Sequence, residues 1–557
     1  MRIVLPKPSR QWKFDRLFTV ELNDFDVERL LPTLFYLIIT RGRARGARRN
    51  DPKNFDEFLD RLVKHDRLNG FDEPLTRRTM ERWLRAAIVK MGRTGRGKKG
   101  EQIEFPLPWT LLTYKSGLPT EISRQRKVHV FLYQLLTATL GETHGGSGEA
   151  ELEQLIKRSF GRGAAIGAAP MYNGQYDGET ELDVHTLLSM LYLDGFELSG
   201  VGKKETTDVN DPALPKFAHS MGKDILRFIL AYEDRMPVLG LTRGLITLIN
   251  VELFVYTLKL FYATNSLVTA HELPLAMTAE ASTSPPEVYV DFTRDRGSVS
   301  DELSRACVDR DLEELRVFFD SSLLLRTIDR FLDFIPDLRK RLSGLSTPEY
   351  LLELDRLRGQ SDVLARAQAE VESIRHETVN ACQNDTERAA AEEYFAAEIQ
   401  GDDALAVALK LLSDAGKKNY VRNTTQWFWS VGGLRKNYGL LSGNITGRRN
   451  WRYSPSDDLL STLVRLAMVE DPGGDLKHVT TRSTLPLSNF LEFLETRFGF
   501  VVARPPDFLD SVTSRTAATR NLEALKRRLR QMGFFRDLSD DFNAQYLYME
   551  TVQETTR

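Results

Sequence analysis

Apolar positions in this chain recur mainly at intervals of three and four residues, the period of an α-helix. The clearest run lies near the C-terminus, with steps of four, three, four and three residues: Ala518, Leu522, Leu525, Leu529 and Met532. This run predicts an amphipathic helix over residues 516–532, closed by Gly533. Runs that alternate as strands do are few, and 288–292 is one of them. The pattern therefore predicts a mainly α, multi-domain helical protein with few short strands.

Two strongly apolar helices are predicted in the middle of the chain, over residues 217–233 and 241–263. The second is long enough to cross a membrane, but Asn250, Glu252 and Lys259 interrupt it. Ionisable groups are costly inside a bilayer, so we expect a buried core helix and no membrane partner. Within such a core, Glu252 is expected to be hydrogen-bonded or ion-paired rather than catalytic.

Length and composition suggest a multi-domain intracellular protein. A chain of 557 residues exceeds the size of a single core, and its two cysteines indicate a reducing cytoplasm. The changes of pattern along the chain define five regions: an N-terminal helical domain with a candidate helix-turn-helix (1–145), an apolar helical core domain (146–282), a helical domain with a long exposed helix (283–415), a basic aromatic segment (416–453) and a C-terminal domain (454–557).

Charge is distributed unevenly, although the net charge is only -2. Residues 417–456 contain no Asp or Glu, yet hold eight cations and seven aromatic residues. Cations neutralise phosphates and aromatic rings stack on bases, so this composition predicts nucleic-acid binding, with duplex DNA favoured. Glycines from Gly432 onward favour a surface of loops and short helices rather than one helix. The candidate binding residues here are Lys417, Lys418, Arg422, Trp427, Trp429, Arg435, Lys436, Arg448, Arg449, Trp451 and Arg452.

The C-terminal region has the order helix, helix, strand, basic helix and terminal hairpin, which resembles a winged-helix domain. The resemblance makes residues 516–531 the recognition helix and 536–545 the wing. Four cations of that helix are further candidates for nucleic-acid contact: Arg520, Lys526, Arg527 and Arg530. The wing tip departs from the pattern, because Asp540 and Asp541 stand where phosphate contact favours Lys or Arg. A winged helix that binds protein therefore remains an alternative.

The whole architecture is similar to the non-catalytic components of bacterial multi-gene anti-phage systems, such as those linked to DNA methylation. The similarity covers residues 451–549 and transfers no catalytic residue.

Motifs for catalysis are absent from the sequence. The eight histidines form no HxxxH or HExxH pattern, so we expect no metal, cofactor or catalytic residue. The best local acidic cluster is Glu179, Glu181 and Asp183 with His185. A helix N-terminus explains this cluster at least as well as a metal site does.

These observations support three hypotheses. The first is a non-enzymatic DNA-binding subunit of a larger cytoplasmic assembly in bacterial anti-phage defence, which has further protein partners. The second is a protein–protein adaptor or scaffold in such a complex, because Trp, Tyr and Arg also dominate protein interfaces. The third is a metal-dependent nuclease, whose few acidic residues a single sequence does not reveal.

Overall fold

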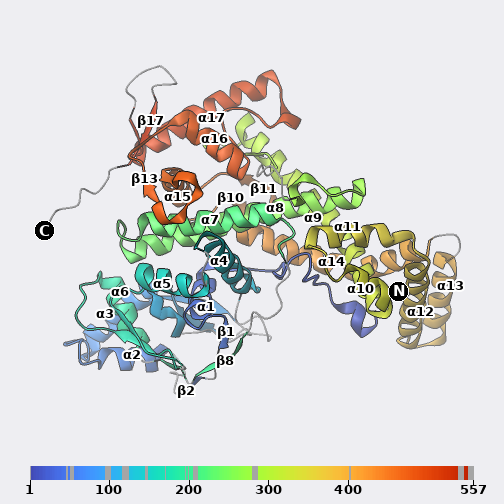
Figure 1. The fold of residues 1–557 in the computed structure, drawn as a ribbon, viewed down its shortest axis with the longest axis horizontal. Coiled ribbons are helices and arrows are strands. Elements are labelled where there is room, and N and C mark those ends of the chain that lie inside the picture. The colour runs from blue at the N-terminus through green and yellow to red at the C-terminus, as the bar shows by residue number, and fades with distance from the viewer. Residues whose placement is uncertain are drawn as a thin grey trace.

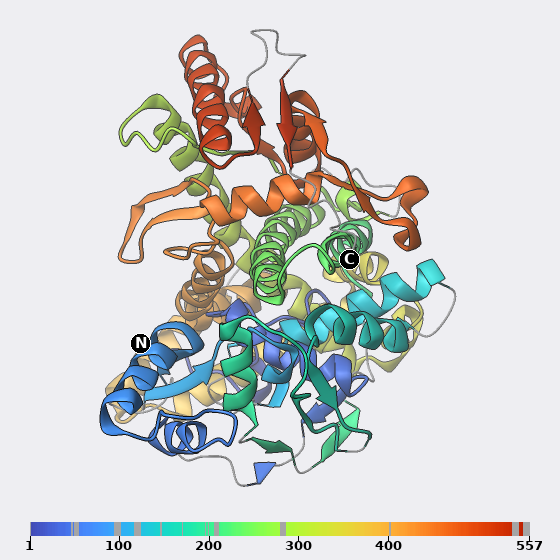
Figure 2. The same cartoon turned by 90° about the vertical axis from the view of Figure 1, so that its left-hand side faces the viewer.

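The computed structural model is mainly α-helical, which confirms the predicted fold class. It describes residues 2–45, 48–49, 55–93, 102–115, 124–144, 148–169, 171–194, 196–198, 200–204, 211–278, 286–399, 403–536 and 545–549. Two long central helices cross the middle of the molecule, with N-terminal helices on one side and the C-terminal elements on the other (Figures 1 and 2). A third group of helices extends from one end.

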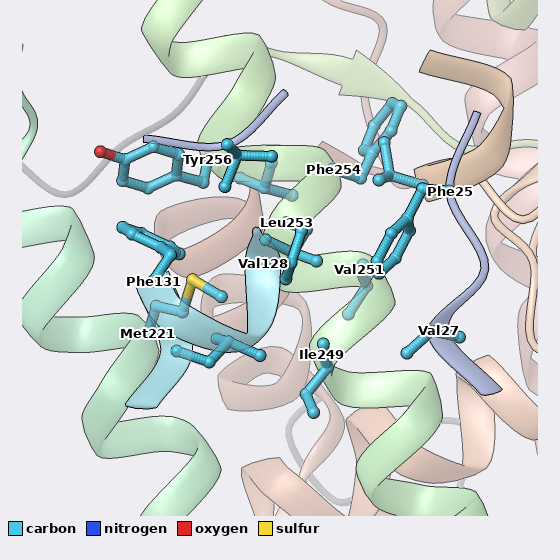
Figure 3. Packing of buried hydrophobic residues seen from close by; sticks show 14 of the residues in the cluster. Phe25, Val27, Val128, Phe131, Met221, Ile249, Val251, Leu253, Phe254 and Tyr256 are labelled. Carbon is cyan, nitrogen blue, oxygen red and sulfur yellow. The ribbon is translucent and has the colours of Figure 1, made fainter. Parts of the chain in front are cut away.

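The central helices are α7 (Pro215–Tyr232) and α8 (Val238–Ala270). By length and composition α8 qualifies as a membrane span, but 83% of its most apolar window is buried inside the fold. Figure 3 shows its side chains packed against apolar residues from the N-terminal segment, α4 (Val128–His144) and α7. The structure thus confirms the predicted core helix.

The N-terminal side is built around α1 (Val27–Ile39), which packs against α4. The candidate helix-turn-helix consists of α2 (Phe55–Val63) and α3 (Pro74–Trp83). The amphipathic pattern of the second helix continues through residues 76–91. The helix itself ends earlier, because a π-helical turn at Leu84–Ile88 leads directly into a hairpin of β3 (Val89–Arg93) and β4 (Gln102–Pro106).

The remaining N-terminal elements are two helices and six short strands. The helices are α5 (Gly148–Phe160) and α6 (Val184–Leu193). The strands form three antiparallel pairs: β1 (Arg43–Arg45) with β8 (Val201–Lys204), β2 (Arg48–Arg49) with β7 (Glu197–Leu198), and β5 (Ala164–Ile166) with β6 (Gly174–Tyr176).

The second half begins with β9 (Val288–Tyr289) and the long helix α9 (Val299–Phe331). Five more helices follow: α10 (Pro336–Leu342), α11 (Thr347–Arg356), α12 (Ser361–Asn380), α13 (Asp385–Ile399) and α14 (Ala404–Val431). The expectation of loops and short helices from Lys417 onward is wrong for the first part of that segment. Helix α14 runs through it unbroken, because its apolar face packs on α9 and α12 and the turn begins only at Gly432.

A β-hairpin follows α14, made of β10 (Leu441–Asn444) and β11 (Gly447–Tyr453). The chain then enters what we call the C-terminal module, residues 454–549. Its helices are α15 (Asp457–Ala467), α16 (Leu487–Phe498) and α17 (Val512–Gln531). Strands β14 (Thr484–Pro486), β17 (Tyr546–Tyr548) and β16 (Phe535–Arg536) form an antiparallel sheet in that order. A small pair, β12 (Val469–Glu470) and β13 (Thr480–Thr481), follows α15.

The C-terminal module is joined to the main body by backbone pairing and by one buried amide. Strand β15 (Phe500–Val501) pairs in parallel with β9. The side chain of Asn521, on α17, donates to the Val290 and Val502 carbonyls at 2.8 and 3.2 Å. It also accepts from the Phe292 amide at 2.7 Å. Such buried polar bonds fix one arrangement, because leaving any of these groups unpaired is costly.

A buried ion-pair network makes a second connection between the module and the core. Arg497 of α16 donates to both carboxylate oxygens of Glu252 on α8, at 2.9 and 2.7 Å, and to Asp224 on α7 at 2.5 Å. Arg227 pairs with the other oxygen of Asp224 at 3.0 Å. The prediction that Glu252 is a hydrogen-bonded or ion-paired core carboxylate is confirmed.

Candidate nucleic-acid interface

The β10–β11 hairpin separates the residues of the basic aromatic segment into a buried set and an exposed set. Trp451 and Tyr453 point into the core, whereas Arg448 and Arg449 near the turn are exposed. This division follows from the strand, because the end of β11 next to α9 is buried while its beginning projects into solvent. Figure 2 shows the hairpin, in orange, running into α15 with α17 above it.

The tryptophans do not form a stacking surface. Trp427 is fully buried, and its indole donates to Thr257 of α8 at 3.1 Å. Trp451 is 1% exposed, and its indole donates to the Asn444 carbonyl at 2.7 Å. Trp429 is partly buried against the core. Neither buried ring is accessible to a base, so Trp427 and Trp451 act as core residues in this fold.

The cations of α14 are placed at the surface. Lys418 and Arg422 are exposed. Lys417 pairs with Asp320 of α9, with Nζ 2.7 and 3.0 Å from the two carboxylate oxygens. Exposed pairs of this kind are weak, so Lys417 remains free to exchange this partner for an external anion.

Four cations line a cavity of about 310 Å³ between the hairpin and the start of α15. We call it the cationic cavity, and its cations are Arg294, Arg435, Lys436 and Arg452. Ser456, which caps the N-terminus of α15 by accepting from the Leu459 amide, also lines it. Partial positive charge at a helix N-terminus adds to that of the side chains.

Each of three carboxylates around this cavity is shared by two cations. Asp301 pairs with Arg452 at 3.3 Å and with Arg305 at 3.1 Å. The other two shared carboxylates are Glu28, between Lys90 and Lys436, and Asp457, between Arg294 and Arg528. These six cations therefore outnumber the three carboxylates with which they pair.

That surplus is reflected in the ionisation of Lys90. Burial, followed by the neighbouring charge of Lys436, lowers the pKa of Lys90 to about 8. Ammonium groups this close repel each other, and the carboxylate of Glu28, which pairs with both, offsets part of that repulsion. Arg435 adds a further positive charge, and it hydrogen-bonds Asn444 at 3.2 Å.

Helix α17 presents part of its predicted basic face to solvent. Arg520, Arg527 and Arg530 are exposed. Lys526 is buried and pairs with Glu523 at 2.7 Å. Arg528 was not among the predicted site residues. It reaches Asp457 at the edge of the cationic cavity and so connects α17 with it.

The predicted wing falls mostly outside the described residues. Strands β16 and β17 flank it, but residues 537–544, which include Asp540 and Asp541, are not among those that the structure describes.

Sequence reasoning also missed Arg294 and Lys90. No local pattern identifies either, because Arg294 follows β9 and Lys90 lies on β3, both far along the chain from the hairpin.

The acidic cluster near α6 is explained by helix capping. Asp183 is the N-cap of α6 and accepts from the Thr186 amide at 3.0 Å. Within the described ranges, no group of three or more His, Cys, Asp and Glu residues has an arrangement that could hold a metal ion.

Comparison with known proteins identifies the class. A mainly helical chain with this architecture belongs among the components of methylation-associated defence systems, which act against phage. Residues 7–548 match the family described as methylation-associated defense system protein MAD7, and the chain belongs to that family. A comparison with curated proteins finds no match. The family confirms the association with methylation-linked defence, and the winged helix stays a prediction.

Proposed function

We propose that this protein is a non-enzymatic, DNA-binding subunit of a cytoplasmic multi-protein assembly in methylation-associated defence. The observation that carries the proposal is the cationic cavity with its three shared carboxylates. A surface that meets a polyanion concentrates positive charge, because cations there neutralise phosphates and raise the local concentration of the ligand.

The arrangement of the C-terminal module supports the same function. A helix, a strand, two helices and a hairpin, with the sheet order β14-β17-β16, agree with a winged helix in which α17 enters a groove. Arg520 and Arg527 are exposed on that helix. Arg528 and Arg294 both pair with Asp457, so α17 is connected to the edge of the cationic cavity through this carboxylate.

The contacts divide by role. Arg448 and Arg449 on the hairpin, with Lys418 and Arg422 on α14, neutralise phosphates, while α17 provides contacts in the groove. Arg452 and Lys526 are buried and ion-paired, so their part is to hold neighbouring groups in place.

The test is a salt titration of duplex DNA binding, followed by fluorescence anisotropy from about 50 to 300 mM KCl. In the variant Arg448→Ala/Arg449→Ala, loss of two phosphate contacts reduces the slope of log K against log salt by about 1.8. With equal affinities of variant and wild type at 1 M salt, this change in slope makes the variant bind roughly 60-fold more weakly than wild type near 0.1 M salt. The matched control is Arg375→Ala/Arg388→Ala on α12 and α13, which removes one partly exposed and one exposed arginine elsewhere and leaves binding unchanged.

Two results oppose the proposal. Wild-type protein that does not bind duplex DNA at low salt, yet co-purifies with another protein of the system, favours the adaptor hypothesis instead. An unchanged salt slope in the Arg448→Ala/Arg449→Ala variant shows that these two arginines do not contact phosphates, even when the protein binds DNA.

A further inference from the structure

A second charged cavity lies far from the hairpin, where the N-terminal segment crosses the end of α9. It has a volume of about 360 Å³ and is bounded by residues 8–16, the last turns of α9, and residues from α10 and α11. Figure 1 places the N-terminus beside these helices. We call it the N-terminal cavity. Its volume lies at the lower end of the range of small-molecule sites.

Cations outnumber carboxylates around the N-terminal cavity. Its five cations are Lys13, Arg16, Arg326, Arg330 and Arg339, and its three carboxylates are Asp15, Asp329 and Asp333. The carboxylates are already engaged by other cations. Arg339 pairs with Asp329 at 2.8 Å and with Asp333, and Lys13 pairs with Asp15.

Arg326 is the unusual member of this group. Arg326 is only 7% exposed. Its Nη2 atom is buried without a hydrogen-bond partner, and the side chain forms no ion pair among the described residues. The guanidinium stands over the Trp12 ring, 4.9 Å from the ring centre. Burial, with a contribution from the nearby Arg330 charge, lowers the pKa of Arg326 to about 10.

Trp12 itself is held in place by close packing on α14. A Cβ atom at Gly416 would lie 2.0 Å from the Trp12 ring, so only glycine allows the ring to sit there. The ring in turn fixes the guanidinium above it. The site is therefore built with a charge at a set position. The nearby Glu370 carboxylate attracts this charge but forms its ion pair with Arg330, at 2.7 Å, and not with Arg326.

We propose that the N-terminal cavity binds a small phosphate-bearing molecule through Arg326, assisted by Arg16 and Lys13. A buried guanidinium without a counter-ion is strongly unfavourable, and a dianionic phosphate supplies the missing charge. Arginine suits this ligand because its planar fork donates two parallel hydrogen bonds to phosphate oxygens. This site is independent of the DNA surface proposed above.

Two probes distinguish the sources of the phosphate group: inorganic phosphate and adenosine 5′-monophosphate. Isothermal titration calorimetry of the wild-type protein measures binding of each at constant ionic strength. One-to-one binding of either probe is expected. Tighter binding of the nucleotide assigns the site to a phosphorylated metabolite, and equal or tighter binding of phosphate assigns it to the free ion. The proposal is overturned when neither probe gives binding heat and neither raises the melting temperature of the protein.

The variant Arg326→Met keeps the length of the side chain and removes its charge. Loss of at least tenfold in affinity is expected, while the melting temperature without probe stays equal or rises, because a buried unpaired charge has been removed. Arg316→Met, an exposed substitution on the same helix, is the control and retains wild-type binding. Phosphate also stabilises proteins non-specifically, so a response of Arg326→Met equal to that of wild type overturns the assignment.

Discussion

The network of Arg497, Asp224 and Glu252 makes a specific prediction about pH. Burial raises the pKa of Glu252 to about 8; the charge of Arg497 opposes that rise and the charge of Asp224 adds to it. For Asp224, burial opposes ionisation, but Arg497 and Arg227 outweigh it and lower the pKa. Within the network, Arg497 and Arg227 favour the charged form of Asp224, whereas burial and the charge of Asp224 favour the protonated form of Glu252.

The sign of the effect follows from proton binding. The folded protein holds a proton on Glu252 that the unfolded chain has already lost above its ordinary pKa of 4.5. The stabilisation is complete below that ordinary value and is lost as the pH rises through about 8. Between pH 7 and 9 the loss in unfolding free energy is on the order of 1 kcal/mol.

The perturbation is Glu252→Gln, which replaces the protonated acid with a neutral group of the same size. Urea unfolding followed by tryptophan fluorescence at pH 7 and pH 9 is the assay. We expect the variant to lack the part of the pH dependence that Glu252 supplies. Arg497→Met is the companion, because it leaves two buried carboxylates without their shared cation and costs about 3–5 kcal/mol. Equal losses in wild type and Glu252→Gln between pH 7 and 9 would refute the reasoning.

Two further predictions concern buried residues, Trp427 and Asn521, which stabilise the fold. Trp427→Ala removes a fully buried ring and is expected to lower stability by about 3–5 kcal/mol in urea unfolding; a loss of DNA affinity at full stability would contradict this. Asn521→Leu leaves three backbone groups without partners and is expected to cost about 3 kcal/mol, whereas the exposed neighbour Arg520→Ala stays within about 0.5 kcal/mol of wild type. Stability of Asn521→Leu equal to that of Arg520→Ala would show that the amide does not join the module to the core.

The sequence predicted those parts of the fold that depend on local periodicity. The regular spacing in α17 identified the helix, although it begins at Val512 rather than Thr516 because Ser511 caps it. The polar interruptions of α8 correctly argued for a core helix, since Glu252 has partners from α7 and α16 that no local pattern reveals.

The candidate binding residues were harder to predict, because the composition of a segment does not show which of its side chains are buried. The absence of acidic residues from 417–456 indicated unpaired charge, yet Arg452 is paired with Asp301 from a distant helix. The end of β11 that packs next to α9 buries Trp451, while Arg448 and Arg449 before it are exposed. The surplus of positive charge was predicted by the sequence, while its location required the three-dimensional contacts of Arg294 and Lys90.

The parallel pairing of β9 with β15 ties the C-terminal module to the main body through backbone hydrogen bonds. Asn521 reinforces that pairing from α17 itself, so the helix and the β10–β11 hairpin keep a fixed angle and separation. A nucleic acid that touches both has to match this preset geometry. Bending a duplex costs energy that depends on its sequence, so under the function proposed above such a fixed arrangement would select among DNA segments by their curvature before any base is contacted.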